Sequence, residues 1–244
     1  MNGIDSVKDN LIGQLWCPVV ARAGPIFFPR RRNRKMKVLT LTNDRNFREI
    51  AAFKDNKLTR NEDIIVWTHS HIKKVRLETE VPQAQILGLA RYEDSFGSSC
   101  SLWNDFPFDV LNLDFASQDI FSENGRIEKE IESLETTLKR QYEAASEAKR
   151  AVLIYTTMVN GQDINAASII NKSNSLIVAG QPFSIPQNVG TGGGSKQEKI
   201  DFIENIIKVL CSKYGYANCM FERMQCPVAG SQDIVYSIAT IIQQ

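Results

Sequence analysis

The sequence predicts an α/β fold, a doubly wound and mostly parallel sheet of seven strands whose C-terminal strand is reversed. Five short apolar runs alternate with helical or loop segments up to Met158. The central run, FDVLNLDF from Phe108 to Phe115, precedes a long helical pattern and then AVLIYTTM from Ala151, which is typical of a strand, a crossover helix and a parallel strand. The connection between the last two apolar runs is too short for a parallel crossover.

The composition is that of an ordinary globular chain. Its 244 residues, 43% hydrophobic and 23% charged, suffice for one large domain with a core. The net charge of +1 excludes a general attraction to nucleic acid or anionic membranes, so such binding requires a local patch. No apolar run reaches the roughly 18 residues of a spanning helix, and the N-terminus lacks the pattern of a signal peptide. We therefore expect a cytoplasmic protein without a membrane segment.

The sequence offers no complete set of metal ligands. Its five cysteines include no CxxC pair, and six residues separate the closest two, Cys219 and Cys226. The only histidines, His69 and His71, lack an identifiable third ligand. We expect reduced thiols, a surface role for the histidines and no metal.

Residues 1–36 are expected to form an irregular leader that lies over the main domain, 37–244. Pro18, Gly24, Pro25 and Pro29 interrupt its short apolar pieces.

The leader ends in a basic cluster, RRRNRKMK. It places six positive charges in eight residues, on Arg30, Arg31, Arg32, Arg34, Lys35 and Lys37. Arginine forks suit phosphate oxygens, and neutralising phosphates releases counterions, so the cluster predicts contact with nucleic acid. A solvated turn before the first strand, or contact with an acidic partner surface, fits the same residues.

Three further strands precede the central one. They are KVLTLT from Lys37 to Thr42, IIVW ending at Thr68, and ILGLA between Pro82 and Glu93. Asn43 or Asp44 is suited to cap the helix that follows the first strand. Ligands of such sheets bind beyond the carboxyl ends of the strands.

The crossover helix is predicted over residues 124–150. Its apolar residues recur at spacings of three and four and form one stripe toward the sheet, namely Ile127, Ile131, Leu134, Leu138, Tyr142 and Ala145. The rest of the helix is expected to be solvated. At 27 residues it is about 40 Å long, more than a sheet edge needs. Its excess end is therefore expected to meet a protein partner or a second copy, although a break in the helix fits the pattern equally.

The segment 159–194 is less regular and is interpreted as a lid or a substrate-facing insertion. Its GTGGGS is followed by Ser195-Lys196-Gln197 and so is no Walker phosphate loop. Ser195 and Glu198 instead predict a capping box for a helix. After that helix, YANCMF from Tyr216 and DIVYSIATII from Asp233 predict the antiparallel strand pair.

From Lys37 onward the chain resembles the class I S-adenosylmethionine-dependent methyltransferase superfamily, by element order and by FDVLNLDF in the place of that family's fourth strand. The resemblance implies S-adenosylmethionine as cofactor. It places the methionine part near Thr42, Asn43 and Asp44, the ribose near Thr68 and His69, the adenine near Glu93 and Asp94, and a substrate-facing group at Asp114.

The family's motifs are degenerate in this sequence. The turn LTNDRNF has no glycine, THSH lacks the acid that pairs with the ribose, and LDFA does not match the Pro-Pro-Tyr type of motif. Asp114 suits the orientation of a substrate amine or a role as base, but an acid in this place also commonly caps the following turn.

Three functions stay open at this point. The first is a methyltransferase acting on nucleic acid or protein. The second is a catalytically inactive pseudoenzyme that serves as scaffold or complex subunit. The third is a nucleic-acid-binding module.

Overall fold

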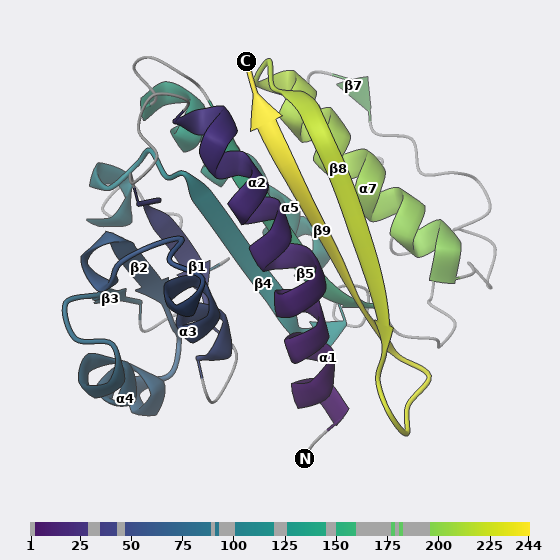
Figure 1. Cartoon of the computed structure of the whole chain (residues 1–244). Helices are drawn as coiled ribbons and strands as arrows, with labels where there is room; N and C mark the ends of the chain where they lie inside the picture. Colours follow the sequence, from purple (N-terminus) through teal and green to yellow (C-terminus); the bar gives the residue numbers. More distant parts are fainter. Residues whose placement is uncertain are drawn as a thin grey trace.

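The computed structural model describes residues 3–28, 35–42, 47–88, 91–92, 101–119, 126–144, 150–159, 177–178, 181–182 and 196–244. Within these residues lies a seven-stranded sheet with the order β3-β2-β1-β4-β5-β9-β8 (Figure 1). Its strands are β1 (Val38–Leu41), β2 (Ile64–Trp67), β3 (Gln85–Leu87), β4 (Val110–Asp119), β5 (Arg150–Val159), β8 (Ala217–Pro227) and β9 (Ile234–Gln243). A separate two-stranded sheet pairs β6 (Ile177–Val178) with β7 (Gln181–Pro182).

The strand directions confirm the predicted fold class. Strands β1 to β5 are parallel, whereas β9 runs antiparallel to β5, from the pair Arg150↔Gln243 to the pair Val159↔Ile234. Strand β8 is antiparallel to β9, and the backbone N–H of Val228 donates to the carbonyl of Asp233, 3.0 Å away, across the hairpin. So short a connection cannot cross the sheet, which is why the C-terminal strand is reversed.

The described helices cover both faces of the sheet. They are α1 (Gly3–Leu11), the π-helical turn η1 (Ile12–Trp16), α2 (Cys17–Phe27), α3 (Arg48–Asp55), α4 (His71–Glu80), α5 (Arg126–Ala144) and α7 (Lys196–Lys213), with short 3-10 turns η2 (Asn61–Asp63) and η4 (Ser101–Asn104). Figure 1 shows α1 and α2 across the front of the central strands, with α5 behind them. None of the described helices is long and apolar enough to cross a membrane.

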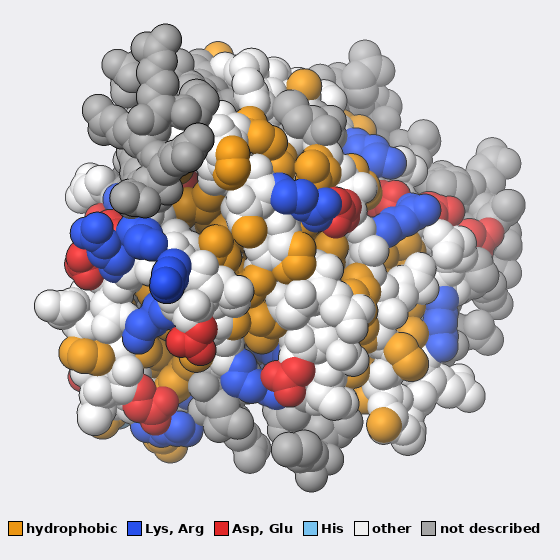
Figure 2. Space-filling view, in the orientation of Figure 1, with side chains coloured by type: hydrophobic (Ala, Val, Ile, Leu, Met, Phe, Trp, Pro, Cys, Tyr) orange, Lys and Arg blue, Asp and Glu red, His pale blue; other side chains and the backbone are white. Residues whose placement is uncertain are grey.

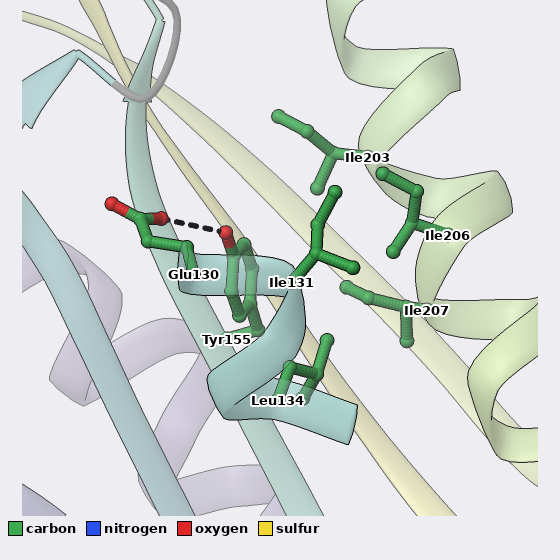
Figure 3. A pocket seen from close by; sticks show the side chains of 7 residues that line it. All are labelled: Glu130, Ile131, Leu134, Tyr155, Ile203, Ile206 and Ile207. Carbon is green, nitrogen blue, oxygen red and sulfur yellow. Dashed lines mark hydrogen bonds between the residues drawn. The ribbon is translucent and has the colours of Figure 1, made fainter. Parts of the chain in front are cut away.

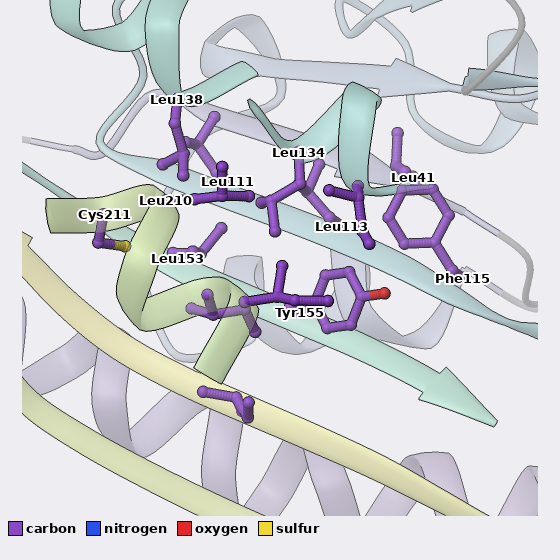
Figure 4. Close-up of a cluster of buried hydrophobic side chains, with 14 of the residues drawn as sticks. Leu41, Leu111, Leu113, Phe115, Leu134, Leu138, Leu153, Tyr155, Leu210 and Cys211 are labelled. Atoms are coloured by element: carbon purple, nitrogen blue, oxygen red, sulfur yellow. The ribbon is translucent and has the colours of Figure 1, made fainter. Parts of the chain in front are cut away.

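Alternate strand residues supply two separate cores. On the face covered by α5 and α7, Leu111, Leu113 and Leu153 pack against Leu134 and Leu210 (Figure 4). On the other face, Val110, Val152 and Ile154 pack against the N-terminal helical segment, together with Phe53 of α3. This period of two follows from the strand backbone, which points successive side chains to opposite faces.

The prediction of an irregular leader is wrong for residues 3–27, which are helical from α1 through α2. Apolar residues spaced by three or four form a buried stripe on this segment: Val7, Leu11, Leu15, Val19, Ala23 and Phe27. Pro18 is tolerated because it stands in the first turn of α2, directly after the wide π turn. The stripe was missed because the prolines were interpreted as breaks. Residues 29–34 lie outside the described part of the chain.

Helix α5 also differs from its prediction. It spans Arg126–Ala144, and β5 begins at Arg150. Besides the predicted apolar stripe, four polar residues are fully buried: Glu130, Ser133, Thr137 and Gln141. The Gln141 side chain accepts a hydrogen bond from the Phe108 backbone N–H (2.9 Å) and donates to the Phe108 carbonyl (2.8 Å). The expectation of a wholly solvated second face was wrong because these side chains find partners inside the fold.

Candidate functional site

The candidate site lies where the strand order reverses, between β1 and β4. The chain leaves β1 for α3 on one face of the sheet and leaves β4 for α5 on the opposite face. Thr40 of β1 is in register with Asn112 of β4, so two residues further along come Thr42 and Asp114. In open α/β sheets, ligands bind outside the carboxyl ends of the strands at such a switch point. Thr42 and Asp114 therefore mark the place where a ligand is expected in this class of fold.

Glu49 lies beside Thr42, in the first turn of α3. Its side chain is 1% exposed, and neither carboxylate oxygen has a hydrogen bond of ordinary geometry to a described residue. The buried Thr42 hydroxyl lies close enough to influence the Glu49 carboxylate, but it also has no hydrogen bond of ordinary geometry within the described part of the chain. Among the described residues, Glu49 is the buried acid that lacks partners on both oxygens. Unpaired buried carboxylates are costly, so this arrangement points to a missing donor.

The α3 helix starts with strained backbone. Phe47, the residue before its first turn, has φ +49° and ψ +37°, in the left-handed region, although its ring is buried. A bulky residue seldom adopts this conformation. No side chain caps the helix at Phe47, and the predicted caps Asn43 and Asp44 lie outside the described residues. Strain of this kind is concentrated at functional sites.

Asp114 forms a buried ion pair with Lys8 of α1. The Nζ of Lys8 lies 2.6 Å from Oδ2 of Asp114, and the two side chains are 6% and 2% exposed. An ammonium and a carboxylate in contact stabilise each other's charge where little water is present. The N-terminal helix thus inserts a cation beside Asp114, which was predicted to face a substrate at the end of its strand but lies midway along β4.

The charges of this site act on Glu49 together. Burial raises the pKa of Glu49, and the neighbouring negative charge of Asp114 adds to the rise, while the Lys8 ammonium and the nearby Thr42 hydroxyl oppose it. The Lys8 ammonium therefore acts on both carboxylates.

At the end of β2, Thr68 is buried and His69 is exposed. The Thr68 hydroxyl accepts from the Ser70 backbone N–H (3.3 Å), and the Ser70 hydroxyl caps α4 by accepting from the Lys73 N–H (3.3 Å). Gly88 follows β3 with φ +96°, and a Cβ there would stand 2.6 Å from the Thr68 carbonyl oxygen. Only glycine at position 88 allows the backbone after β3 to come this close to the backbone after β2.

The opposite face of the same sheet end is filled by aromatic rings. Centroid distances of 5.5, 6.5 and 5.6 Å link Trp67, Tyr92, Phe115 and Tyr155 in one row. At the end of the row the Tyr155 hydroxyl donates to Oε2 of Glu130, 3.0 Å away (Figure 3). A small pocket beside this bond is lined by aliphatic side chains of α5 and α7: Ile131, Leu134, Ile203, Ile206 and Ile207. On this face the buried Glu130 carboxylate therefore has a hydrogen-bond donor, the Tyr155 hydroxyl.

The structure describes three of the seven predicted cofactor and catalytic residues. Thr42 and Asp114 come together at the switch point, and His69 follows β2 on the neighbouring strand. Asn43, Asp44, Glu93 and Asp94 lie outside the described residues, and their roles stay predictions.

The predicted nucleic-acid surface lies at the other end of the sheet. Lys35 precedes β1, and its ammonium contacts the Lys57 carbonyl oxygen. Arg30, Arg31, Arg32 and Arg34 lie outside the described residues. Figure 2 shows Lys and Arg side chains gathered on the flank of the molecule near β2 and α3. Lys35 stands before the amino end of β1, whereas Asp114 lies level with Thr42, just beyond the carboxyl end of β1. The two predicted features are therefore at opposite ends of β1.

Lys8 and Glu49 were not predicted as site residues. Lys8 stands among the apolar stripe positions of α1, next to Val7, where a lysine on a buried helix face is unusual. That pattern signals a buried partner of opposite charge. Glu49 stands between Arg48 and Ile50 at the start of α3 and resembles an ordinary first-turn acid, which the helix dipole favours. Nothing in the sequence separates it from such acids.

No protein-family model matches the sequence, and no curated protein matches it. Among solved structures, the plantazolicin methyltransferase BpumL, in complex with a desmethylPZN analogue and SAH, is 12% identical over 97% of this chain and 89% of its own, with a TM-score of 0.46. TYW2 of M. jannaschii, solved with AdoMet, is 8% identical over 96% and 80%, with a TM-score of 0.43. The magnesium protoporphyrin IX methyltransferase ChlM of Synechocystis PCC 6803, with bound SAH, is 10% identical over 93% and 82%, with a TM-score of 0.41.

At these identities the likeness concerns the fold alone, and the strand order decides it. A parallel core ordered β3-β2-β1-β4-β5, extended by an antiparallel pair whose C-terminal strand lies between β5 and β8, is the arrangement predicted from the sequence. The chain has the class I methyltransferase-like fold.

Proposed function

We propose that the chain is an S-adenosylmethionine-dependent methyltransferase that binds its cofactor at the crevice between β1 and β4. The observation that carries the proposal is the Glu49 carboxylate, which is buried at the switch point and has no hydrogen bond of ordinary geometry to a described residue at either oxygen. A ligand that donates from a positive group would satisfy it. The methionine part of S-adenosylmethionine carries an ammonium, and its sulfonium adds a second positive charge.

The residues at the crevice fit such a ligand in kind. Glu49 and the Thr42 hydroxyl accept from the ammonium, which fits the predicted position of the methionine part near Thr42, Asn43 and Asp44. The resemblance to class I methyltransferases implies the ribose near His69, the adenine near Glu93 and Asp94, and the acceptor near Asp114. When bound, the cofactor supplies an electrophilic methyl group.

The chain's own groups exclude water and hold charge at this place. Glu49, Asp114 and Lys8 are all buried, so the attraction between a carboxylate and a cation is stronger here than in water.

Calorimetric titration with S-adenosylmethionine and S-adenosylhomocysteine tests the proposal. We expect wild-type protein to bind both, and Glu49→Gln to weaken each by about 10- to 100-fold, the value of a hydrogen bond to a charged group. Glu204→Gln is the matched control, because Glu204 is a buried acid of α7 on the other face. Absence of binding by wild-type protein, or an equal loss in both variants, contradicts the proposal.

A second candidate is a catalytically inactive scaffold of the same fold. The Lys8–Asp114 ion pair favours the inactive scaffold, because the Lys8 ammonium already binds the carboxylate that an external substrate would meet. The glycine-free turn after β1 favours it as well. This candidate predicts no heat of binding and no methyl transfer, and leaves the partner-binding role to the 124–150 segment.

Nucleic acid as substrate depends on Arg30, Arg31, Arg32, Arg34 and Lys35. Because Lys35 stands at the sheet edge opposite Asp114, a nucleic acid held there would have to wrap around the domain to reach the crevice. Replacing Arg30, Arg31 and Arg32 with Ala should flatten the salt dependence of RNA binding. Unchanged binding excludes this role of the cluster.

A further inference from the structure

The sheet face beneath the N-terminal helical segment changes from apolar to polar along the strands. Near the amino ends of the parallel strands, one row of paired residues is wholly apolar: Val38, Val110, Val152 and Ile241. Four residues further along each parallel strand lies a polar row: Thr42, Asp114, Thr156 and Ser237. A helix on the apolar row buries hydrocarbon, whereas a helix on the polar row covers groups that water solvates well.

Helix α2 is fixed to this face by apolar contacts. Its buried side chains belong to the same core as the apolar row and are Cys17, Val19, Val20, Ala23 and Phe27. Toward the end of α2, the Cζ atom of Arg150 lies 5.2 Å from the centroid of the Phe27 ring. Lifting α2 would expose this hydrocarbon to water, which the hydrophobic effect opposes.

Helix α1 is held in a different way. Figure 1 shows α1 and α2 as successive stretches of one helical segment that crosses the sheet. Between Ser6 and Leu11 the buried side chains are Val7, Lys8 and Leu11, and the Lys8 ammonium meets the polar row at Asp114. Opening α1 hydrates both charges of this ion pair, so their hydration offsets the attraction that is lost.

The groups beside α1 gain from water. The Glu49 carboxylate, the Thr42 hydroxyl and the side-chain carbonyl of Asn112 are buried and have no hydrogen bond of ordinary geometry to a described residue. Buried polar groups without such bonds are destabilising, and water that enters on opening would bond to them. Opening α1 is therefore easier than lifting α2.

The turn η1 between the two helices provides a hinge. It is a π-helical turn, a form often found at functional sites, and it contains the exposed Gly13. A Cβ at position 13 would have no heavy atom within 4 Å outside its own turn, and the backbone there is not left-handed, so neither packing nor conformation requires glycine. At the end of η1, Nε1 of Trp16 donates to the Ser237 hydroxyl over 2.9 Å. The bend therefore falls at Gly13, before the part of the segment that is fixed.

We propose that α1 is a lid that opens at Gly13 while α2 stays on the sheet, and that its opening uncovers Thr42, Glu49 and Asp114. These three side chains are at most 2% exposed in the closed form, so an external ligand reaches them only after their cover moves. The identity of that ligand rests on the proposed function, whereas the opening itself stands on the geometry of the N-terminal segment.

The opening is measured by labelling thiols with iodoacetamide and locating the label by peptide mapping. Val7→Cys places a thiol on the buried side of α1, and the native Cys17 of α2 is the matched control, because the side chains of Val7 and Cys17 are 4% and 7% exposed. We expect the thiol of Val7→Cys to react about tenfold faster than Cys17, or more, since local opening requires less free energy than global unfolding. Cys211 of α7, which is fully buried on the other face, should react as slowly as Cys17.

The uncovering of the site is measured at Thr42→Cys, whose thiol should react in step with that of Val7→Cys. Gly13→Ala should slow both reactions about two- to fivefold, because alanine favours the unbroken helix over the bent turn, and should leave Cys17 unchanged. Gln14→Ala is the matched control in the same turn. Glutamine is already a good helix former, so this variant should change the rates by less than about twofold.

Equal rates at Val7→Cys, Cys17 and Cys211 overturn the lid, because α1 then opens only when the whole domain unfolds. Fast reaction of Val7→Cys without reaction of Thr42→Cys also overturns it, because the helix then frays without uncovering the site. If either variant does not fold, hydrogen exchange of wild-type protein decides. The amides of residues 8–12 should exchange about tenfold faster than those of residues 20–27, and equal exchange overturns the lid.

The lid and the proposed function fail separately. None of these measurements uses S-adenosylmethionine, so failure of the lid leaves the calorimetric test of cofactor binding as it stands. Absence of cofactor binding with fast labelling of Val7→Cys and Thr42→Cys overturns the proposed function and leaves the lid.

Discussion

Glu49 and Glu204 are two buried glutamates, one on each side of the sheet, in opposite situations. Glu204 of α7 accepts hydrogen bonds at Oε1 from the Tyr236 hydroxyl (2.5 Å) and from Arg223 (2.7 Å), and Lys208 lies 3.5 Å from Oε2. Glu49 of α3 is less exposed, and neither of its carboxylate oxygens has a hydrogen bond of ordinary geometry to a residue that the structure describes. The Glu204 carboxylate thus links α7 to β8 and β9, whereas the Glu49 carboxylate makes no comparable link within the described part of the chain.

The hydrogen bonds at Glu204 and their absence among described residues at Glu49 go with opposite shifts of the two pKa values. Burial alone raises the pKa of Glu204, but the bonds from Tyr236 and Arg223 and the charges of Arg223 and Lys208 outweigh it and lower the pKa below its ordinary value. For Glu49, burial raises the pKa, and the Lys8 charge does not outweigh it. This contrast between a hydrogen-bonded glutamate and one without such bonds to described residues is the basis for the proposed role of Glu49 in binding a ligand.

Lys8→Met should have the largest effect, because it removes the ammonium that lies 2.6 Å from the buried Asp114 carboxylate. We expect the free energy of unfolding to fall by about 3–5 kcal/mol, the usual cost of breaking a buried ion pair from one side. Urea denaturation measures it. The double variant Lys8→Met/Asp114→Asn, with no unpaired charge at Asp114, should recover more than half of the loss. Equal losses in the single and double variants would show that the pair contributes only packing.

Tyr236→Phe should be the next in size. It removes the hydroxyl that donates to Glu204, and hydrogen bonds to charged groups contribute about 1.5–3 kcal/mol. Glu49→Gln removes no such bond and should cost less, or stabilise the fold. The two variants are compared by their denaturation midpoints at pH 7. A larger loss in Glu49→Gln than in Tyr236→Phe would mean that Glu49 already has a structural partner.

The fold could be predicted because its signals are local. Apolar runs such as 64–67 and 151–158 predict strands without reference to the rest of the chain. The short connection between β8 and β9 predicts that these two strands are antiparallel. The N-terminal helix could not be predicted from its prolines alone. Pro18 stands where a helix tolerates it, after a π turn that no local pattern announces.

The site could be predicted only in outline. The position of Asp114 follows from the strand order, since the carboxyl ends of parallel strands share one edge. Its partner Lys8 is 106 residues away in sequence, and the contact depends on how the N-terminal helix lies on the sheet. Glu49 could not be distinguished from other first-turn acids in the sequence, because its hydrogen-bond partners depend on how the chain folds around it.

The pH dependence of stability should have opposite signs for the two glutamates. Glu204 has a lowered folded pKa, so its contribution is present above the unfolded value of 4.5 and is lost as the pH falls through the folded pKa. Glu49 has a raised folded pKa, so the unfolded chain releases the proton first and stability falls as the pH rises from 4.5 toward the folded pKa.

The measurement is the unfolding free energy of Glu49→Gln and Glu204→Gln against wild-type protein between pH 3 and pH 8. A tenfold difference in acidity between the folded and unfolded states corresponds to about 1.4 kcal/mol. Relative to wild type, Glu49→Gln should gain stability with rising pH and Glu204→Gln should lose it. Parallel profiles would remove the distinction between the two acids.

Lys208→Ala should have the smallest effect and shows which contacts secure Glu204. The Lys208 side chain is 48% exposed and lies 3.5 Å from Glu204 one helical turn away. Exposed pairs with this spacing contribute about 0.3–0.5 kcal/mol because water and salt screen them. We therefore expect a loss in this range at low salt that vanishes in 1 M NaCl, measured by urea denaturation, while the loss in Tyr236→Phe persists. If Lys208→Ala instead cost as much as Tyr236→Phe, Glu204 would depend on its surface cation, and its contrast with Glu49 would reduce to a difference in nearby positive charge.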